Sequence, residues 1–160
     1  MDRIVFGLTF LAAIGSGLMA GLFFVFSVSV MGAFGKLPAP TGIAAMQSIN
    51  TTILNPIFMA AFMGTALVCV VLAIFGVTRW SQPGAAWLIA GALLYIVGTL
   101  LVTIVFNVPL NDTLASVSPD SVEGASLWRT YLEVWTGWNH VRTVASTGAL
   151  ACFMLALRAQ

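Results

Sequence analysis

The chain has 160 residues, of which 60% are hydrophobic, and its mean hydropathy is +1.04. Six basic and five acidic residues give a formal net charge of +1. This composition excludes an ordinary soluble domain, and the lack of a basic cluster argues against nucleic acid as a partner. We expect one membrane domain over residues 1–160, with the lipid bilayer as its surroundings.

Charged residues delimit long apolar segments. Arg3 and Lys36 are separated by 32 uncharged residues. The next two intervals, of 42 and 32 uncharged residues, end at Arg79 and Asp112. A helix of about 20 apolar residues crosses a hydrocarbon core of about 30 Å. The pattern predicts an all-α integral membrane protein, an antiparallel four-helix bundle with helices at about 4–31, 53–77, 85–106 and 134–157.

Turn residues separate these helices. Glycine and prolines within residues 35–40 break the chain after the first helix, and residues 81–84 form a tight turn after the second. Asn55 followed by Pro56 is a typical helix start, with the N-cap side chain preceding a proline at the first helical position. Before the fourth helix we expect an extended loop with a short amphipathic helix, because Leu127, Tyr131 and Val134 recur at helical spacing.

Basic residues near the helix ends indicate the orientation. Arg3, Arg79 and Arg158 fall on the side of the two termini, whereas Lys36 and Arg129 fall on the other. Since cytoplasmic loops carry an excess of Lys and Arg, this bias predicts a multi-pass protein of the plasma (inner) membrane with both termini in the cytoplasm.

This topology gathers polar side chains at one membrane face. They come from the first outer loop, the start of the second helix, the end of the third and the start of the fourth: Gln47, Asn50, Asn55, Asn107, Asn111, Asn139, His140, Arg142 and Thr143. Polar groups inside an apolar bundle are unfavourable unless they satisfy one another or a ligand. The clustering predicts a pocket that opens to that face.

The roles of these residues have alternatives. The amides of Asn107 and Asn111 either satisfy backbone groups freed by Pro109 or donate to a ligand oxygen. Arg142 either reaches the membrane interface or lies over Trp138, four residues away. A tryptophan at 135 fits a simple interfacial belt.

His140 and Arg142 are two apart, which is about 200° around a straight helix, so they do not face one point. We expect His140 to face inward as a proton acceptor and Arg142 to pair with a neighbouring helix or a headgroup.

Three stretches together resemble the anthrone oxygenase family of small membrane proteins. They run from Met46-Gln47-Ser48-Ile49-Asn50 to Asn55-Pro56, then Asn107-Val108-Pro109-Leu110-Asn111, then Trp138-Asn139-His140-Val141-Arg142-Thr143. Phe23-Phe24 in the first helix extends the resemblance over nearly the whole chain. Fungal members give the family its name by oxidising anthrones to anthraquinones.

The resemblance implies an oxidoreductase that oxidises a small aromatic or polyketide-like apolar substrate with O₂. Such a reaction needs a base, donors for the developing oxyanion and a dry aromatic pocket. His140 would be the base, and Asn107, Asn111 and Arg142 the catalytic donors. The substrate would be bound by Asn139, Trp138, Gln47, Asn50, Asn55, Phe23, Phe24 and Thr143.

We predict no cofactor and no metal, because the sequence has a single histidine, no dinucleotide-binding motif and no Cys-x-x-Cys-His haem attachment. The alternative is haem or a metal at His140, held with a methionine or between the subunits of a homo-oligomer. A second alternative is a small-molecule-binding protein or accessory subunit without catalysis of its own.

Overall fold

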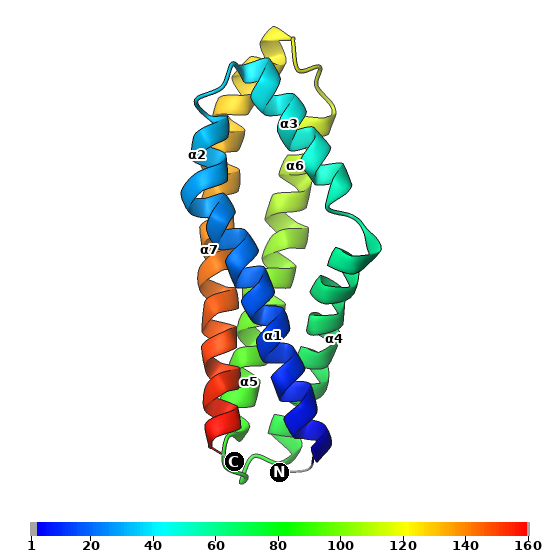
Figure 1. Cartoon of the computed structure of the whole chain (residues 1–160), viewed down its shortest axis with the longest axis vertical. Coiled ribbons are helices and arrows are strands. Elements are labelled where there is room, and N and C mark those ends of the chain that lie inside the picture. The colour runs from blue at the N-terminus through cyan, green and yellow to red at the C-terminus, as the bar shows by residue number, and fades with distance from the viewer. Residues whose placement is uncertain (1–2, 160) are drawn as a thin grey trace.

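Four helical spans are long and apolar enough to cross a membrane within residues 3–159, the part of the chain that this computed structural model describes. They cover Arg3–Phe34, Pro56–Thr78, Ala85–Ala115 and Val122–Arg158. Positions 1, 2 and 160 of the predicted domain lie outside the described residues. The start of the first span and the end of the fourth lie at the same end of the bundle (Figure 1). Large apolar side chains are exposed along all four spans, which suits contact with acyl chains. The predicted all-α membrane bundle is therefore confirmed.

The spans are built from several helical elements. The first contains α1 (Arg3–Val25), the π-helical turn η1 (Phe26–Val30) and α2 (Met31–Phe34). A connecting helix, α3 (Ala39–Thr52), leads to the second span, α4 (Pro56–Thr78). The third contains α5 (Ala85–Leu93), the π-helical segments η2 (Leu94–Leu101) and η3 (Thr103–Asn107), and α6 (Val108–Ala115). The fourth is the single helix α7 (Val122–Arg158).

Residues 39–52 form helix α3, where the sequence analysis predicted a loop. Pro40 lies in the first turn, where a missing N–H removes no helical hydrogen bond. Ile43 and Met46, three apart, bury one face of α3, which packs against α6 and α7. Figure 1 shows α3 crossing the end of the bundle opposite the termini. The segment therefore caps that end of the bundle.

Two predicted helix boundaries were wrong. The third span continues through Pro109 to Ala115, because the proline falls in the first turn of α6, directly after the wider turn of η3. The fourth helix begins at Val122 rather than at residue 134, with the hydroxyl of Ser121 accepting a 2.9 Å hydrogen bond from the Gly124 N–H. The predicted amphipathic segment is thus the first part of α7.

The prediction that Asn55 caps the start of the second helix is confirmed. The Asn55 side-chain oxygen accepts hydrogen bonds from the backbone N–H groups of Ile57 at 3.1 Å and Phe58 at 3.0 Å. Pro56 occupies the first turn of α4.

Two hydrophobic clusters fill the bundle. One lies between α1, α4, α5, η2 and α7 and includes Leu72, Tyr95 and Phe153. The other joins α3, α6 and the first half of α7 and includes Met46 and Trp128. The second cluster packs the capped end of the bundle, whereas the first extends from the termini end to Phe23 and Phe62.

We expect Gly15→Ala to lower the free energy of unfolding by about 1–3 kcal/mol, the usual cost of overpacking. A Cβ at Gly15 would overlap the hydroxyl of Thr65 on α4, which itself donates to the Ala61 carbonyl at 2.6 Å. Gly21→Ala is the matched control on the same helix, because a Cβ there meets no atom within 4 Å. Denaturant titration of both variants in mixed micelles tests this, and equal stability would contradict the close α1–α4 approach.

Candidate functional site

A cavity of about 620 Å³ lies beneath α3, in the capped half of the bundle. This volume falls within the range of about 300–1,000 Å³ that ligand pockets occupy. Most of its wall is apolar and aromatic, and its polar side chains come from α3, η3, α6 and α7. The principal lining residues are Phe23, Phe26, Met46, Gln47, Asn50, Phe58, Met59, Phe62, Met63, Thr103, Ile104, Val108, Asn111, Asp112, Trp135 and Arg142.

Helical spacing determines which residues reach the cavity. On α6 the lining residues are Val108, Asn111, Asp112 and Ala115, at the i, i+3, i+4 and i+7 positions of one face. On α7 they are Trp135 and Arg142, two turns apart. Each of these helices therefore turns one continuous stripe of side chains toward the cavity.

The cavity opens sideways between α4 and the third span. Met59 and Met63 on α4, and Ile104 and Val108 opposite them, are lining residues that are also exposed. In Figure 1, α4 and α6 separate toward the end that α3 covers. The rim of the opening is thus mostly apolar, and it lies on the outer surface of the bundle.

Arg142 is the central polar residue of the cavity. Its side chain is 5% exposed, and the guanidinium lies 4.3 Å from the ring centroid of Phe23 and 5.0 Å from that of Trp135. Nη2 donates to Asn139 Oδ1 at 2.7 Å, and Nη1 donates to Thr103 Oγ1 at 3.3 Å. No carboxylate of the described residues pairs with it. A buried cation without an acidic partner is costly, so this position favours an anionic ligand.

Asn139 positions this guanidinium. It is fully buried, and its Nδ2 donates to the Phe23 carbonyl at 2.7 Å and to Ser27 Oγ at 2.8 Å. These two bonds fix the amide so that its oxygen faces Arg142. Thr143 donates to the Asn139 carbonyl at 2.9 Å and lies 3.1 Å from Ser27 Oγ, outside the cavity lining. Asn139 and Thr143 therefore hold the Arg142 side chain in position without lining the cavity themselves.

Asn107 and Asn111 both reach α7 rather than backbone groups of their own helix. Asn111 Oδ1 accepts hydrogen bonds of 2.8 Å from the Tyr131 hydroxyl and from Trp135 Nε1. Its amide nitrogen is left without a partner in the described chain and belongs to a lining residue. Asn107 Nδ2 donates to the Trp135 carbonyl at 3.2 Å, and this buried residue is not part of the lining. Of these two asparagines, Asn111 is the one placed to donate to a ligand.

Three buried polar atoms near the site lack a hydrogen-bond partner among the described residues. They are Nε of Arg142, Nδ2 of Asn50 and Oδ1 of Asn107. The first two belong to lining residues and are donors. Buried polar atoms are rarely left unpaired, so these donors indicate a ligand acceptor.

The prediction that His140 faces the pocket was wrong. His140 is exposed on the outer surface of α7 and does not line the cavity, whereas Arg142 does. The two lie about 200° apart on the helix, and burial of Asn139 and Arg142 turns the imidazole outward. An exposed imidazole on this surface cannot act as the base for a substrate inside the cavity, nor can it ligate a group held there.

Three further predicted contacts were also wrong. Trp138 stacks on Phe106 at a centroid distance of 3.7 Å, away from the cavity, so the guanidinium lies over Trp135 instead. Phe24 is 54% exposed, and Asn55 caps α4. In contrast, five of the candidate residues line the cavity: Phe23, Gln47, Asn50, Asn111 and Arg142. Within this group, Gln47 is engaged structurally, donating to the carbonyls of Leu114 at 2.8 Å and Val117 at 3.1 Å.

Sequence reasoning missed several lining residues. Trp135 was assigned to an interfacial belt, although it is four residues before Asn139 and seven before Arg142, a spacing that places all three on one face. Phe58 and Phe62, whose ring centroids are 5.6 Å apart, also line the cavity. Nothing in their sequence pattern distinguishes them from ordinary core residues.

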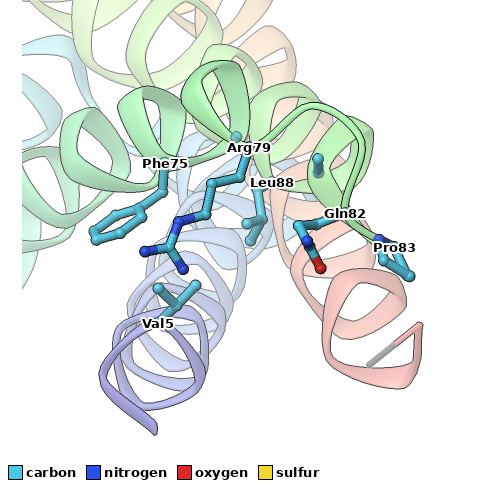
Figure 2. Close-up of a pocket in the computed structure, with 8 residues that line it drawn as sticks. Val5, Phe75, Arg79, Gln82, Pro83 and Leu88 are labelled. Carbon is cyan, nitrogen blue, oxygen red and sulfur yellow. The ribbon is translucent and has the colours of Figure 1, made fainter. Parts of the chain in front are cut away.

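A smaller cavity of about 230 Å³ lies at the opposite end, around the α4–α5 turn. Figure 2 shows Arg79 and Gln82 there beside Val5, Phe75 and Leu88. The Arg79 guanidinium lies 5.3 Å from the Phe75 ring centroid, and the residue is exposed. The polar side chains that line this smaller cavity, Arg79 and Gln82, are exposed rather than buried. We therefore assign the candidate site to the larger cavity.

Potential metal ligands are scattered through the described part of the chain, where no three His, Cys, Asp or Glu residues come together. Such grouping is what a protein-held metal ordinarily needs. The polar groups of the large cavity are instead mostly hydrogen-bond donors.

Comparison with known proteins identifies the family. The family model described as anthrone oxygenase matches residues 57–152, which extend from the start of α4 through most of α7. No curated protein and no solved structure matches the chain. The matched region covers more than half of the sequence and contains Asn111, Trp135 and Arg142. The chain is therefore a member of the anthrone oxygenase family.

Proposed function

We propose that this membrane protein oxidises a planar aromatic ketone of the anthrone type with O₂ inside the large cavity. The observation that carries the proposal is Arg142, a buried guanidinium that lies over two aromatic rings and has no acidic partner among the described residues. An enolate of an aromatic ketone supplies the anion and the flat apolar body that such a site favours.

The polar groups of the cavity suit a developing oxyanion. The guanidinium of Arg142 and the free amide nitrogen of Asn111 both belong to the lining and are donors. Donors that are fixed before the reaction stabilise charge as it forms, at no cost of reorganisation. Phe23, Phe58 and Phe62 supply the apolar wall that excludes water from the enolate.

The reaction balances with O₂ as the oxidant. Loss of a proton from the methylene carbon opposite the carbonyl leaves its electron pair delocalised onto the carbonyl oxygen. The enolate carbon then transfers electrons to O₂ and forms a C–O bond, which gives a hydroperoxide once it is protonated. Loss of water from the hydroperoxide gives the quinone, so one ketone and one O₂ yield one quinone and one water. We propose that this chemistry needs neither a metal nor an organic cofactor.

We also propose that the protein lies in the plasma (inner) membrane with both termini in the cytoplasm. The bias of Arg3, Arg79 and Arg158 toward the termini side supports this orientation. All the groups that the proposal uses come from one chain, so it requires no homo-oligomer.

We expect the purified protein in lipid nanodiscs to convert anthrone to anthraquinone with one O₂ consumed per product. An oxygen electrode and chromatographic product analysis measure the ratio, and nanodiscs without protein give the background oxidation. An absorption spectrum of the same sample tests the cofactor-free mechanism, since haem or flavin absorbs in the visible range. A rate equal to the background, or activity that scales with a bound chromophore, would contradict the proposal.

A further inference from the structure

The reaction proposed above requires a proton acceptor, and the predicted one, His140, lies outside the cavity. The described lining contains two charged side chains, Arg142 and Asp112. Arg142 is a permanent cation and a donor, so it cannot accept the proton. A carboxylate that is within reach of a substrate carbon can act as a general base.

Asp112 has the placement that this role requires. It lies on the cavity stripe of α6, between Asn111 and Ala115, and follows Val108 by one helical turn. Asn111, its neighbour on the same stripe, presents the free amide nitrogen. A ketone whose oxygen lies at the donors of Asn111 and Arg142 would therefore have the α6 carboxylate along the same wall.

The carboxylate of Asp112 is also uncommitted. Its backbone carbonyl accepts a 3.2 Å hydrogen bond from the Ser116 N–H, but its side chain makes no hydrogen bond or ion pair in the described chain. The residue is exposed and lies close to the end of the third span, which stops at Ala115. An exposed position lets the carboxyl group lose its proton to water after each turnover.

We infer that Asp112 is the catalytic base that removes the methylene proton of the substrate. This assignment rests on the proposed function and specifies its first step. The C–H bond breaks, an O–H bond forms on the Asp112 carboxylate, and the electron pair moves to the ketone oxygen beside Arg142. O₂ is not needed for this step, so proton removal can be observed separately from oxidation.

Anaerobic deuterium exchange isolates the step. Anthrone is incubated in D₂O with the full chain in nanodiscs, and mass spectrometry follows deuterium at the methylene carbon. We expect the wild-type protein to accelerate exchange and Asp112→Asn to lose about 100-fold or more of that acceleration, the usual contribution of a general base. Asp112→Glu should recover part of it. Asp120→Asn, an exposed carboxylate outside the cavity, should exchange as the wild type does.

Binding of anthraquinone, followed by quenching of tryptophan fluorescence, should change less than about 3-fold in Asp112→Asn, because a base contributes to reaction more than to product binding. The assignment would be overturned, while the proposed function stands, if Asp112→Asn exchanges deuterium at the wild-type rate. It would also be overturned if the slower exchange of Asp112→Asn is fully explained by weaker binding of anthraquinone. A wild-type protein that neither accelerates exchange nor oxidises anthrone in air would overturn both.

Discussion

Arg142→Met should reduce anthrone oxidation by about 100-fold to 1,000-fold, the loss that follows removal of one preorganised oxyanion donor. The guanidinium is the charged donor of the cavity, and its position over Phe23 and Trp135 places it where an aromatic substrate would lie. Because the interaction strengthens as the enolate forms, kcat should fall more than KM rises. Steady-state kinetics in nanodiscs measure both.

The same substitution should leave the fold intact. Removing a buried cation that has no acidic partner in the described part of the chain is favourable, whereas leaving Asn139 Oδ1 unpaired is unfavourable, so the two effects offset. We expect the free energy of unfolding to change by less than about 2 kcal/mol. Arg129→Met, an exposed position on the same helix, is the control for loss of a positive charge. Full activity in Arg142→Met, together with loss of activity in His140→Ala, would contradict the site as assigned.

Asn139→Ala should lower both stability and turnover. The substitution removes the 2.7 Å bond to Arg142 and leaves the Phe23 carbonyl without its side-chain donor. Hydrogen bonds of this kind to a buried charged group contribute about 1.5–3 kcal/mol, so we expect a loss of about 2–4 kcal/mol. The freed guanidinium would no longer be held in place, and misplacement by about 1 Å can reduce a rate by about 100-fold.

Thr147→Ala separates this effect from a general weakening of α7. Thr147 is exposed one turn beyond Thr143, and its hydroxyl donates to the Thr143 carbonyl at 2.8 Å. Exposed substitutions of this type usually change stability by less than about 0.5 kcal/mol. Denaturant titrations and turnover of both variants make the comparison. Equal stability of the two would show that Asn139 does not anchor the guanidinium.

The spans could be predicted from the sequence because the bilayer imposes a simple requirement, a long apolar run between charges. The rest of the helical structure depends on tertiary packing. Helix α3 is too polar to read as a span, and it forms because Ile43 and Met46 are buried against α6 and α7. Pro109 signalled the end of a helix, but a π-helical turn before it permits the chain to continue. Such turns have no simple sequence signature.

The candidate site could be predicted in part from its polar residues, but not in its orientation. Asn111 and Arg142 were among the candidates because polar side chains in an apolar bundle need partners, yet His140 and not Arg142 was expected to face inward. The choice between His140 and Arg142 depended on how α7 rotates about its axis. The chemistry of a proton acceptor favoured the imidazole, whereas the burial of Trp135 and Asn139 places the guanidinium inside. Helical spacing from Trp135 was the signal that would have decided it.

The sideways opening between α4 and α6 affects how the protein would encounter its substrate. The rim residues Met63, Ile104 and Val108 lie on the surface that faces acyl chains, so an apolar ketone would reach the cavity from the lipid phase. The concentration that matters is then the mole fraction of ketone among lipids, not its amount per volume of buffer. Adding inert lipid at constant total ketone would dilute the substrate in its own phase and slow turnover. The quinone would return to the same leaflet, so both molecules would remain in the membrane.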